Sequence, residues 1–313
     1  MKHDQHLIAT SCGDYELLDS GDNMKLERFG AVIVARPETQ ALWKKQNAPL
    51  WTNAHTTFTP PTGGQDKKGL PAGRQGSWYI HKPVPESWVV VRTGLPLIAR
   101  LTGFKHTGIF PEQAPNWEWI AAHVRPKMKV LNLFGYTGAA TIAAARGGAS
   151  VTHVDASKQS LDWAHENARL SGIGEDKIRW ILDDALAFVK REARRLPAQA
   201  GGTKYDGIIL DPPAFGRGAK GEVWKIEEDL PKLLESLKAL FSGKPGSFFL
   251  LNGYAAGYAP RSFAQAVESI FGIVEGECGE MHIKEARGER VVPAGIYVRF
   301  ARHTTDSVSG FVR

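Results

Sequence analysis

The chain has 313 residues, of which 42% are hydrophobic and 23% charged, and its formal net charge is +6. The length predicts one large domain or two unequal ones, and the basic excess favours an anionic partner, although a basic enzyme would show the same charge. Two cysteines and no Cys/His zinc spacing indicate neither a disulfide framework nor a metal site, and no apolar run is long enough for a membrane span.

The first third of the chain is predicted to form a small β-rich module. Apolar or alternating segments rich in β-branched residues favour short strands at 15–21, 31–37, 87–94 and 95–103. Residues 59–77 are dense in proline, glycine and basic residues, which is typical of a long functional or mobile loop. The amino terminus has no signal-peptide pattern, so we expect a cytoplasmic protein and interpret His3 and His6 as part of a polar tail.

From residue 130 onward, strand-like segments alternate with helical ones. Strands are expected at 130–134, 151–155, 178–184, 205–211 and 246–252, and helices at 157–172, 227–243 and 260–272. This alternation predicts a mostly parallel α/β sheet, to which residues 277–286 and 294–302 add a terminal antiparallel pair. We expect a boundary between about residues 103 and 125 and assign the two domains to residues 1–110 and 111–313.

Four successive strand ends carry residues suited to ligand binding. They are the turn Gly135-Tyr136-Thr137-Gly138, then Asp155, then Asp183 with Asp184, and finally Asp211-Pro212-Pro213. Ligands bind at the carboxyl ends of the strands in such sheets, where a carboxylate like Asp155 can accept both hydroxyls of a ribose. Taken singly, Asp155 or Asp184 could instead cap the following helix. The turn lacks the third glycine of a dinucleotide fingerprint, which disfavours a nicotinamide-dependent enzyme and a phosphate-bearing ligand.

The order GYTG, VDAS, DDA, DPPAF resembles the class I S-adenosylmethionine-dependent methyltransferases. Residues 132–141, 155–172 and 209–218 are similar to bacterial large-subunit ribosomal-RNA methyltransferases of the cytosine-C5 and guanine-N7 group. The resemblance implies a Rossmann-like sheet, S-adenosyl-L-methionine as donor, S-adenosyl-L-homocysteine as product and large-subunit ribosomal RNA as partner. Residues 104–113 are similar to a segment that borders the donor pocket, although His106, Glu112 and Ala114, the residue just beyond the segment, depart from its pattern.

The resemblance also implies a role for each matched residue. Those that would surround the methionine part of the donor are Phe134, Gly135, Tyr136 and Gly138. Asp155 would hold the ribose with Ala156 against the adenine, and Asp184 would bind the adenine amino group with Ala185 beside it. The other implied donor-site residues are Phe110, Gln113, Asn132, Thr137, Ser157, Asn167 and Asp211.

The Asp-Pro-Pro strand end is the implied catalytic site. Asp211, Pro212 and Pro213 would lie at the reacting methyl group, where the carboxylate and a backbone carbonyl can accept hydrogen bonds from a base. Phe215 would stack on the flipped base. C5 methylation of cytosine needs a cysteine nucleophile, and neither Cys12 nor Cys278 lies in a strand-end motif. We therefore favour a base nitrogen, with guanine N7 and an amino nitrogen both open.

Two alternative functions stay open, and so do the roles of several basic residues. The alternatives are a protein or small-molecule methyltransferase and an RNA-binding protein that holds the donor without chemistry. Candidate RNA contacts follow the Asp-Pro-Pro turn or lie in the long loop: Arg217, Lys220 and Lys225, and then Lys67, Lys68, Arg74, His81 and Lys82 beside Trp78 and Tyr79. Solvated loops would show the same composition. No metal and no oligomeric state is indicated.

Overall fold

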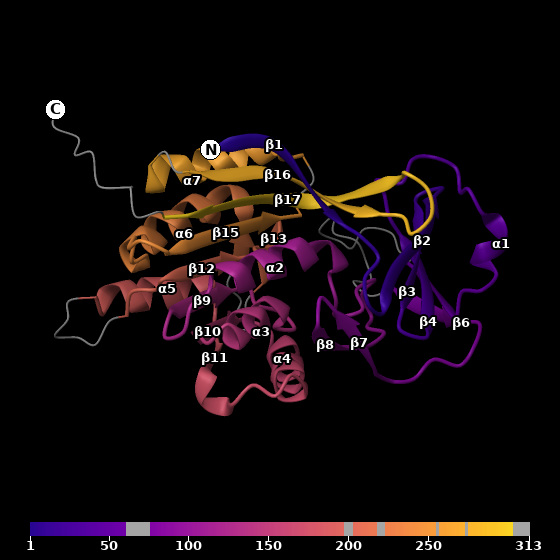
Figure 1. Cartoon of the computed structure of the whole chain (residues 1–313), viewed down its shortest axis with the longest axis horizontal. Helices are drawn as coiled ribbons and strands as arrows, with labels where there is room; N and C mark the ends of the chain where they lie inside the picture. Colours follow the sequence, from indigo (N-terminus) through magenta and orange to yellow (C-terminus); the bar gives the residue numbers. More distant parts are fainter. Residues whose placement is uncertain (61–75, 197–202, 218–222, 255–256, 273–274, 303–313) are drawn as a thin grey trace, which may run out of the picture. The chain divides into compact units, whose positions relative to one another are not determined.

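The computed structural model describes residues 1–60, 76–196, 203–217, 223–254, 257–272 and 275–302. Contacts within the chain divide it into two compact units (Figure 1). The first unit takes the described parts of Met1–Leu7, Asn116–Glu280 and Gly295–Arg313, and the second takes those of Ile8–Pro115 and Met281–Ala294. The division into functional domains at residue 110 stays a prediction.

A mostly parallel eight-stranded sheet organises the first unit, although residues 8–9, 281–284 and 291–294 of its strands belong to the second unit. Its strand order is β1-β16-β17-β15-β12-β9-β10-β11. The strands are β1 (Lys2–Ala9), β9 (Lys129–Leu133), β10 (Ser150–Asp155), β11 (Ile178–Leu182), β12 (Gly207–Leu210), β15 (Phe248–Gly253), β16 (Gly276–Lys284) and β17 (Val291–Ala301). β11, β10, β9, β12 and β15 run parallel to one another, and β17 runs antiparallel to β15. The predicted sheet of parallel strands with an antiparallel carboxyl-terminal part is therefore confirmed.

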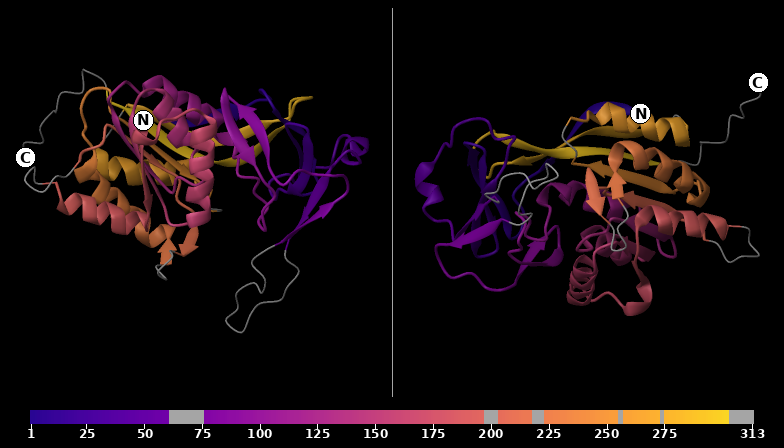
Figure 2. Two further views of the ribbon diagram at one scale, coloured as in Figure 1. Left: turned by 90° about the horizontal axis from the view of Figure 1, so that it is seen from below. Right: turned by 180° about the vertical axis from the view of Figure 1, so that it is seen from behind.

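Helices cover both faces of this sheet. Figure 2 shows α2, α3 and α4 on one face and α5, α6 and α7 on the other. The helices are α2 (Ala114–His123), α3 (Ala139–Arg146), α4 (Lys158–Leu170), α5 (Ala185–Arg194), α6 (Ile226–Leu240) and α7 (Pro260–Phe271), with a 3-10 turn, η2, at Glu175–Lys177. The main core lies under α5, α6 and α7, where Phe188, Leu233 and Phe249 are fully buried. Burial of such side chains contributes about 1.5–3 kcal/mol each.

Local signals in the sequence place the helix that follows β10. Ser157 caps α4 by accepting a hydrogen bond from the backbone N–H of Ser160 at 3.2 Å. Gly172, just beyond the helix, has φ of +70°, a conformation that glycine adopts without the strain other residues incur. The start and stop predicted for this helix are both confirmed.

The second unit contains a five-stranded sheet and a separate hairpin. The sheet has the order β2-β3-β4-β5-β6, and β7 pairs with β8. The elements of the second unit are β2 (Tyr15–Gly21), β3 (Met24–Phe29), β4 (Val32–Pro37), α1 (Ala48–Trp51), β5 (Thr56–Thr59), β6 (Ser77–Ile80), β7 (Trp88–Arg92), β8 (Leu95–Ala99) and the 3-10 turn η1 (Pro111–Gln113). A buried ion pair joins β3 to β4, since Arg36 donates to Glu27 at 2.9 Å while the Tyr15 hydroxyl donates to the same carboxylate at 2.8 Å.

One prediction is wrong, because residues 2–9 form the edge strand β1 and not a polar tail. Polar side chains dominate this strand and hide its alternation. The short strands β13 (Phe215–Arg217) and β14 (Val223–Lys225) were also not predicted. Among the helices of the described residues, none has the length and hydrophobicity needed to cross a membrane.

Candidate functional site: the carboxyl-terminal strand ends of the first unit

The turn after β9 has an unusual backbone. Phe134 and Tyr136 have φ of +57° and +46°, which is a strained conformation for large side chains and costs roughly 1–3 kcal/mol each. Gly135 lies between them, packed so tightly that an added Cβ would overlap the imidazole of His153. The Gly135 N–H donates to Val154 O at 3.1 Å, which holds the turn against β10. Strain retained at a strand end in this way is typical of a binding site.

Asp155 at the end of β10 holds the same turn through its side chain. Its Oδ2 accepts the N–H of Tyr136 and its Oδ1 accepts the N–H of Ser157, both at 2.8 Å. Each carboxylate oxygen has a second lone pair, so both can still accept a ribose hydroxyl. Burial raises the pKa of Asp155, and these two hydrogen bonds oppose that shift. The residue is thus fixed in orientation and keeps the acceptor capacity that a ribose requires.

Several predicted donor-site residues are buried beneath the turn. The side-chain amide of Asn167 in α4 donates to Thr137 O at 2.9 Å, and that of Asn132 in β9 donates to Thr141 Oγ1 at 2.8 Å. Thr141 also hydrogen-bonds His153 Nδ1 at 2.9 Å. We therefore expect Asn132 and Asn167 to position the turn, and their direct contact with a donor stays a prediction. Thr141 and His153 were not predicted, since their polar groups act only through the folded turn.

The two aspartates that follow β11 make different contacts. Asp183 forms an ion pair with Arg191 at 2.6 Å. Asp184 caps α5, its Oδ1 accepting the N–H of Ala187 at 2.8 Å. Its Oδ2 has no hydrogen-bond partner among the described residues and can accept one from an amino group. Asp184 can therefore serve both as a helix cap and as an adenine ligand, with the buried Ala185 behind it.

The Asp-Pro-Pro turn follows β12, a central strand of the sheet. Two carbonyls of the turn are already occupied: Pro213 O accepts the indole N–H of Trp224 at 2.7 Å, and Ala214 O accepts the N–H of Ile226 at 3.1 Å. By contrast, no donor in the described parts of the chain reaches the carbonyl oxygen of Pro212. That carbonyl directly follows the Asp211 carboxylate, whose oxygens can each accept more than one hydrogen bond. The turn thus offers two neighbouring acceptors to a substrate.

Two aromatic residues frame the same turn. Trp224 in β14 packs its ring edge-on against Phe134, with centroids 5.0 Å apart, and so links the Asp-Pro-Pro turn to the turn after β9. Phe215, in contrast, is 54% exposed at the start of β13. An exposed aromatic beside a hydrogen-bonding turn suits stacking of a planar ligand. Sequence reasoning missed Trp224, whose role depends on the hairpin formed by β13 and β14.

A cavity of about 700 Å³ opens beside Asp184. Its walls come from α5, β14 and α6: Asp184, Leu186, Ala187, Lys190, Arg191, Arg194, Arg195, Val223, Trp224 and Asp229. Arg191 pairs with Asp183 and Arg195 with Glu192, whereas Lys190 and Arg194 form no ion pair within the described residues. The Asp229 carboxylate is engaged by the N–H of Lys225 and by Lys232, each at 3.0 Å. The cavity therefore presents a net positive wall.

Other predicted residues lie elsewhere or outside the described residues. In the second unit, Phe110 precedes η1 with its ring 5.1 Å from that of His106, and Gln113 is buried; their donor roles stay predictions. Lys225 pairs with Glu228 at 2.8 Å, which weakens its case as a phosphate contact. Tyr79 is 66% exposed and Trp78 is half-buried. Lys67, Lys68, Arg74 and Lys220 lie outside the described residues, as does the side chain of Arg217.

Comparison with known proteins identifies the family to which the chain belongs. Residues 67–258 match the family model of the S-adenosylmethionine-dependent methyltransferases. A SAM-dependent methyltransferase from Agrobacterium tumefaciens is 36% identical, with a TM-score of 0.84 over 96% of this chain and 95% of that one. The chain therefore belongs to the S-adenosylmethionine-dependent methyltransferase family, and S-adenosyl-L-methionine is its cofactor. SMU.776, a protein solved with S-adenosylhomocysteine, shares the fold at 18% identity and a TM-score of 0.68.

Curated relatives add a more specific similarity. The ribosomal RNA large subunit methyltransferase K/L of Shewanella frigidimarina is 35% identical over 174 residues, covering 54% of this chain and 23% of that protein. The ribosomal RNA large subunit methyltransferase K of Neisseria meningitidis is 27% identical over 235 residues, covering 74% of this chain and 64% of that protein. The chain thus spans less than two thirds of the length of either relative.

Proposed function

We propose that this methyltransferase modifies a base nitrogen of ribosomal RNA, and that the base binds at the Asp-Pro-Pro turn. The observation that carries the proposal is the pattern of occupied carbonyls: those of Pro213 and Ala214 already accept hydrogen bonds, while that of Pro212 accepts none from the described residues. This carbonyl lies next to the Asp211 carboxylate in the chain, and two neighbouring acceptors suit a base edge that bears N–H groups. The exposed Phe215 adds a face for stacking.

The residues of this turn would act mainly by alignment. S-adenosylmethionine, when bound, supplies an electrophilic methyl group on a sulfonium. Asp211 and Pro212 would accept hydrogen bonds from the base and direct its nitrogen lone pair toward the methyl carbon. Trp224 would hold the turn in place through Pro213. Alignment of this kind can supply much of the rate enhancement of a transfer that needs little acid–base help.

The basic cavity beside Asp184 supports a nucleic-acid substrate. Lys190 and Arg194 lie one helical turn apart on α5, and neither lies within ion-pair distance of a carboxylate among the described residues. Cations of this kind neutralise RNA phosphates and release counterions. The names of the curated relatives point in the same direction, toward large-subunit ribosomal RNA. Such a substrate would place the reaction in the cytoplasm.

The direct test is to follow a radiolabelled methyl group. The purified protein is incubated with labelled S-adenosylmethionine and, separately, with ribosomal RNA from a strain that lacks the gene, intact ribosomal subunits and cell protein. We expect label in the RNA or in the subunits' RNA. Label confined to protein would overturn the substrate and keep the family assignment. RNA from the parent strain, already methylated at the target, is the control and should accept little label.

The basic cavity gives a separate prediction. Replacing both Lys190 and Arg194 by alanine should weaken RNA binding. The slope of the logarithm of the RNA association constant against the logarithm of salt concentration should become shallower by about 1.4–1.8, or 0.7–0.9 for each lost phosphate contact. Affinity for S-adenosylhomocysteine should be unchanged. The control is Lys244→Ala, an exposed lysine that precedes β15 and so lies near the amino-terminal end of that strand, away from the carboxyl-terminal strand ends. An unchanged salt slope in the double variant would show that RNA does not bind along α5.

A further inference from the structure

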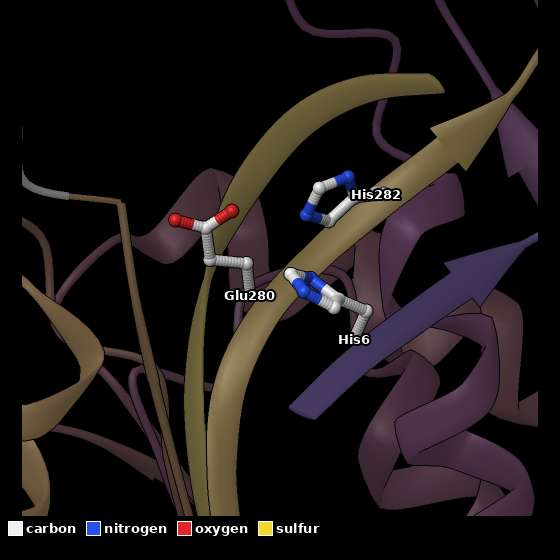
Figure 3. A group of neighbouring side chains, drawn as sticks. All are labelled: His6, Glu280 and His282. Carbon is white, nitrogen blue, oxygen red and sulfur yellow. The ribbon is translucent and has the colours of Figure 1, made fainter. Parts of the chain in front are cut away.

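Three potential metal ligands from distant parts of the sequence gather on the strands β1 and β16. His6, Glu280 and His282 each offer one ligand atom, and these atoms all lie within 4.8 Å of one another (Figure 3). The group is separate from the strand ends that hold the donor site. The sequence did not reveal it, because no spacing links His6 to the other two residues.

Strand geometry explains how these side chains meet. Glu280 and His282 are two residues apart in β16, so their side chains project from the same face of the strand. β1 is the neighbour of β16 in the sheet. The two backbones approach so closely that a Cβ added at Gly279 would overlap the backbone of Gln5. That approach places His6, the next residue of β1, beside the Glu280–His282 pair.

The chemistry of the group suits a transition metal. Two imidazoles and one carboxylate form a ligand set that zinc accepts, with a water completing a tetrahedron. Zinc binds these atoms at about 2.0–2.2 Å, which puts the ligand atoms roughly 3.4 Å apart. His282 is buried to 9% exposure and is held by its surroundings, whereas His6 is exposed and leaves a route for the ion.

We propose that His6, Glu280 and His282 bind one divalent transition-metal ion, with zinc as the best fit. The ion would join the first strand of the chain to β16 through coordinate bonds to both strands. Binding of such an ion only to the folded chain would raise the melting temperature.

The test is calorimetric titration of the untagged, chelator-treated full-length protein with zinc chloride. We expect one equivalent of zinc to bind and the melting temperature to rise. His6→Ala and His282→Ala should each lower zinc affinity by at least about 100-fold, since loss of groups that only support ligands already costs about 10–100-fold. Cobalt(II), used in place of zinc, should give the visible absorption of a tetrahedral site in the parent protein and lose it in both variants.

His3→Ala is the matched control. His3 lies on the same strand, but its imidazole contacts the thiol of Cys278 at 3.2 Å, and its loss should leave zinc affinity unchanged. His6 is exposed, so the His6→Ala variant should fold even if the buried His282 does not tolerate replacement. Absence of stoichiometric zinc binding, or binding that persists in the folded His6→Ala variant, would overturn the proposal.

Discussion

Replacing Asp211 with asparagine should lower kcat/KM for methyl transfer by about 100-fold or more and change the affinity for S-adenosylhomocysteine by less than about tenfold. Asparagine keeps the shape of the side chain but exchanges one acceptor oxygen for a donor, so the base loses a hydrogen bond and its alignment. Small errors in alignment at a reacting centre can cost about this much in rate. Single-turnover kinetics with saturating donor, together with calorimetry, separate the two effects.

Asp206→Asn is the matched control for this variant. Asp206 lies immediately before β12, at the opposite end of the strand from Asp211, and its carboxylate accepts the N–H of Lys129 at 3.0 Å. Transfer activity should stay close to that of the parent protein. Full activity of Asp211→Asn would show that Asp211 is not part of the site. A loss of donor affinity as large as the loss of kcat/KM would indicate that Asp211 binds the donor and does not align the base.

Replacing Asp155 with alanine should abolish tight donor binding. Hydrogen bonds to a charged group contribute about 1.5–3 kcal/mol each, and in the proposed site this carboxylate would accept one from each ribose hydroxyl. Loss of both should lower the affinity for S-adenosylhomocysteine by at least about 100-fold. The variant also loses the acceptors for the N–H groups of Tyr136 and Ser157, so the turn after β9 should loosen. Calorimetry measures the affinity directly.

The pH dependence of donor binding provides an independent check on Asp155. Burial raises the pKa of this carboxyl, so its protonated form is populated at a higher pH than for an ordinary aspartate. The deprotonated form is the one that can accept both hydroxyls. Affinity should therefore fall as the pH drops through that raised pKa, and the fall should be absent in Asp155→Asn. A pH-independent affinity in the parent protein would argue against contact between Asp155 and the ribose.

The strand ends that carry the candidate site could be predicted from the sequence because they depend on local patterns. Alternating strands and helices define a parallel sheet, and the carboxyl ends of its strands lie at one edge. Gly135, Asp155, Asp184 and Asp211 could each be assigned to such an end from the order of residues alone. Ser157 and Gly172 likewise marked the limits of α4 through capping and through a positive φ.

The parts that could not be predicted depend on long-range contacts. Nothing local indicates that Phe134 and Tyr136 adopt positive φ, since that conformation is maintained by Asp155 and by the packing of Gly135 against His153. The occupied carbonyl of Pro213 depends on Trp224, which reaches it only through the hairpin of β13 and β14. The strand β1 was not predicted because its neighbour in the sheet comes from the other end of the chain.

We propose that a base nitrogen of ribosomal RNA is methylated at the Asp-Pro-Pro turn. The most direct measurement is mass spectrometry of nucleosides from unmethylated ribosomal RNA treated with donor and either the parent protein or Asp211→Asn. We expect one new nucleoside with its methyl group on a base nitrogen, formed by the parent protein and nearly absent with the variant. A methyl group on a base carbon or a ribose oxygen, or no methylated nucleoside while protein is labelled, would overturn this proposal.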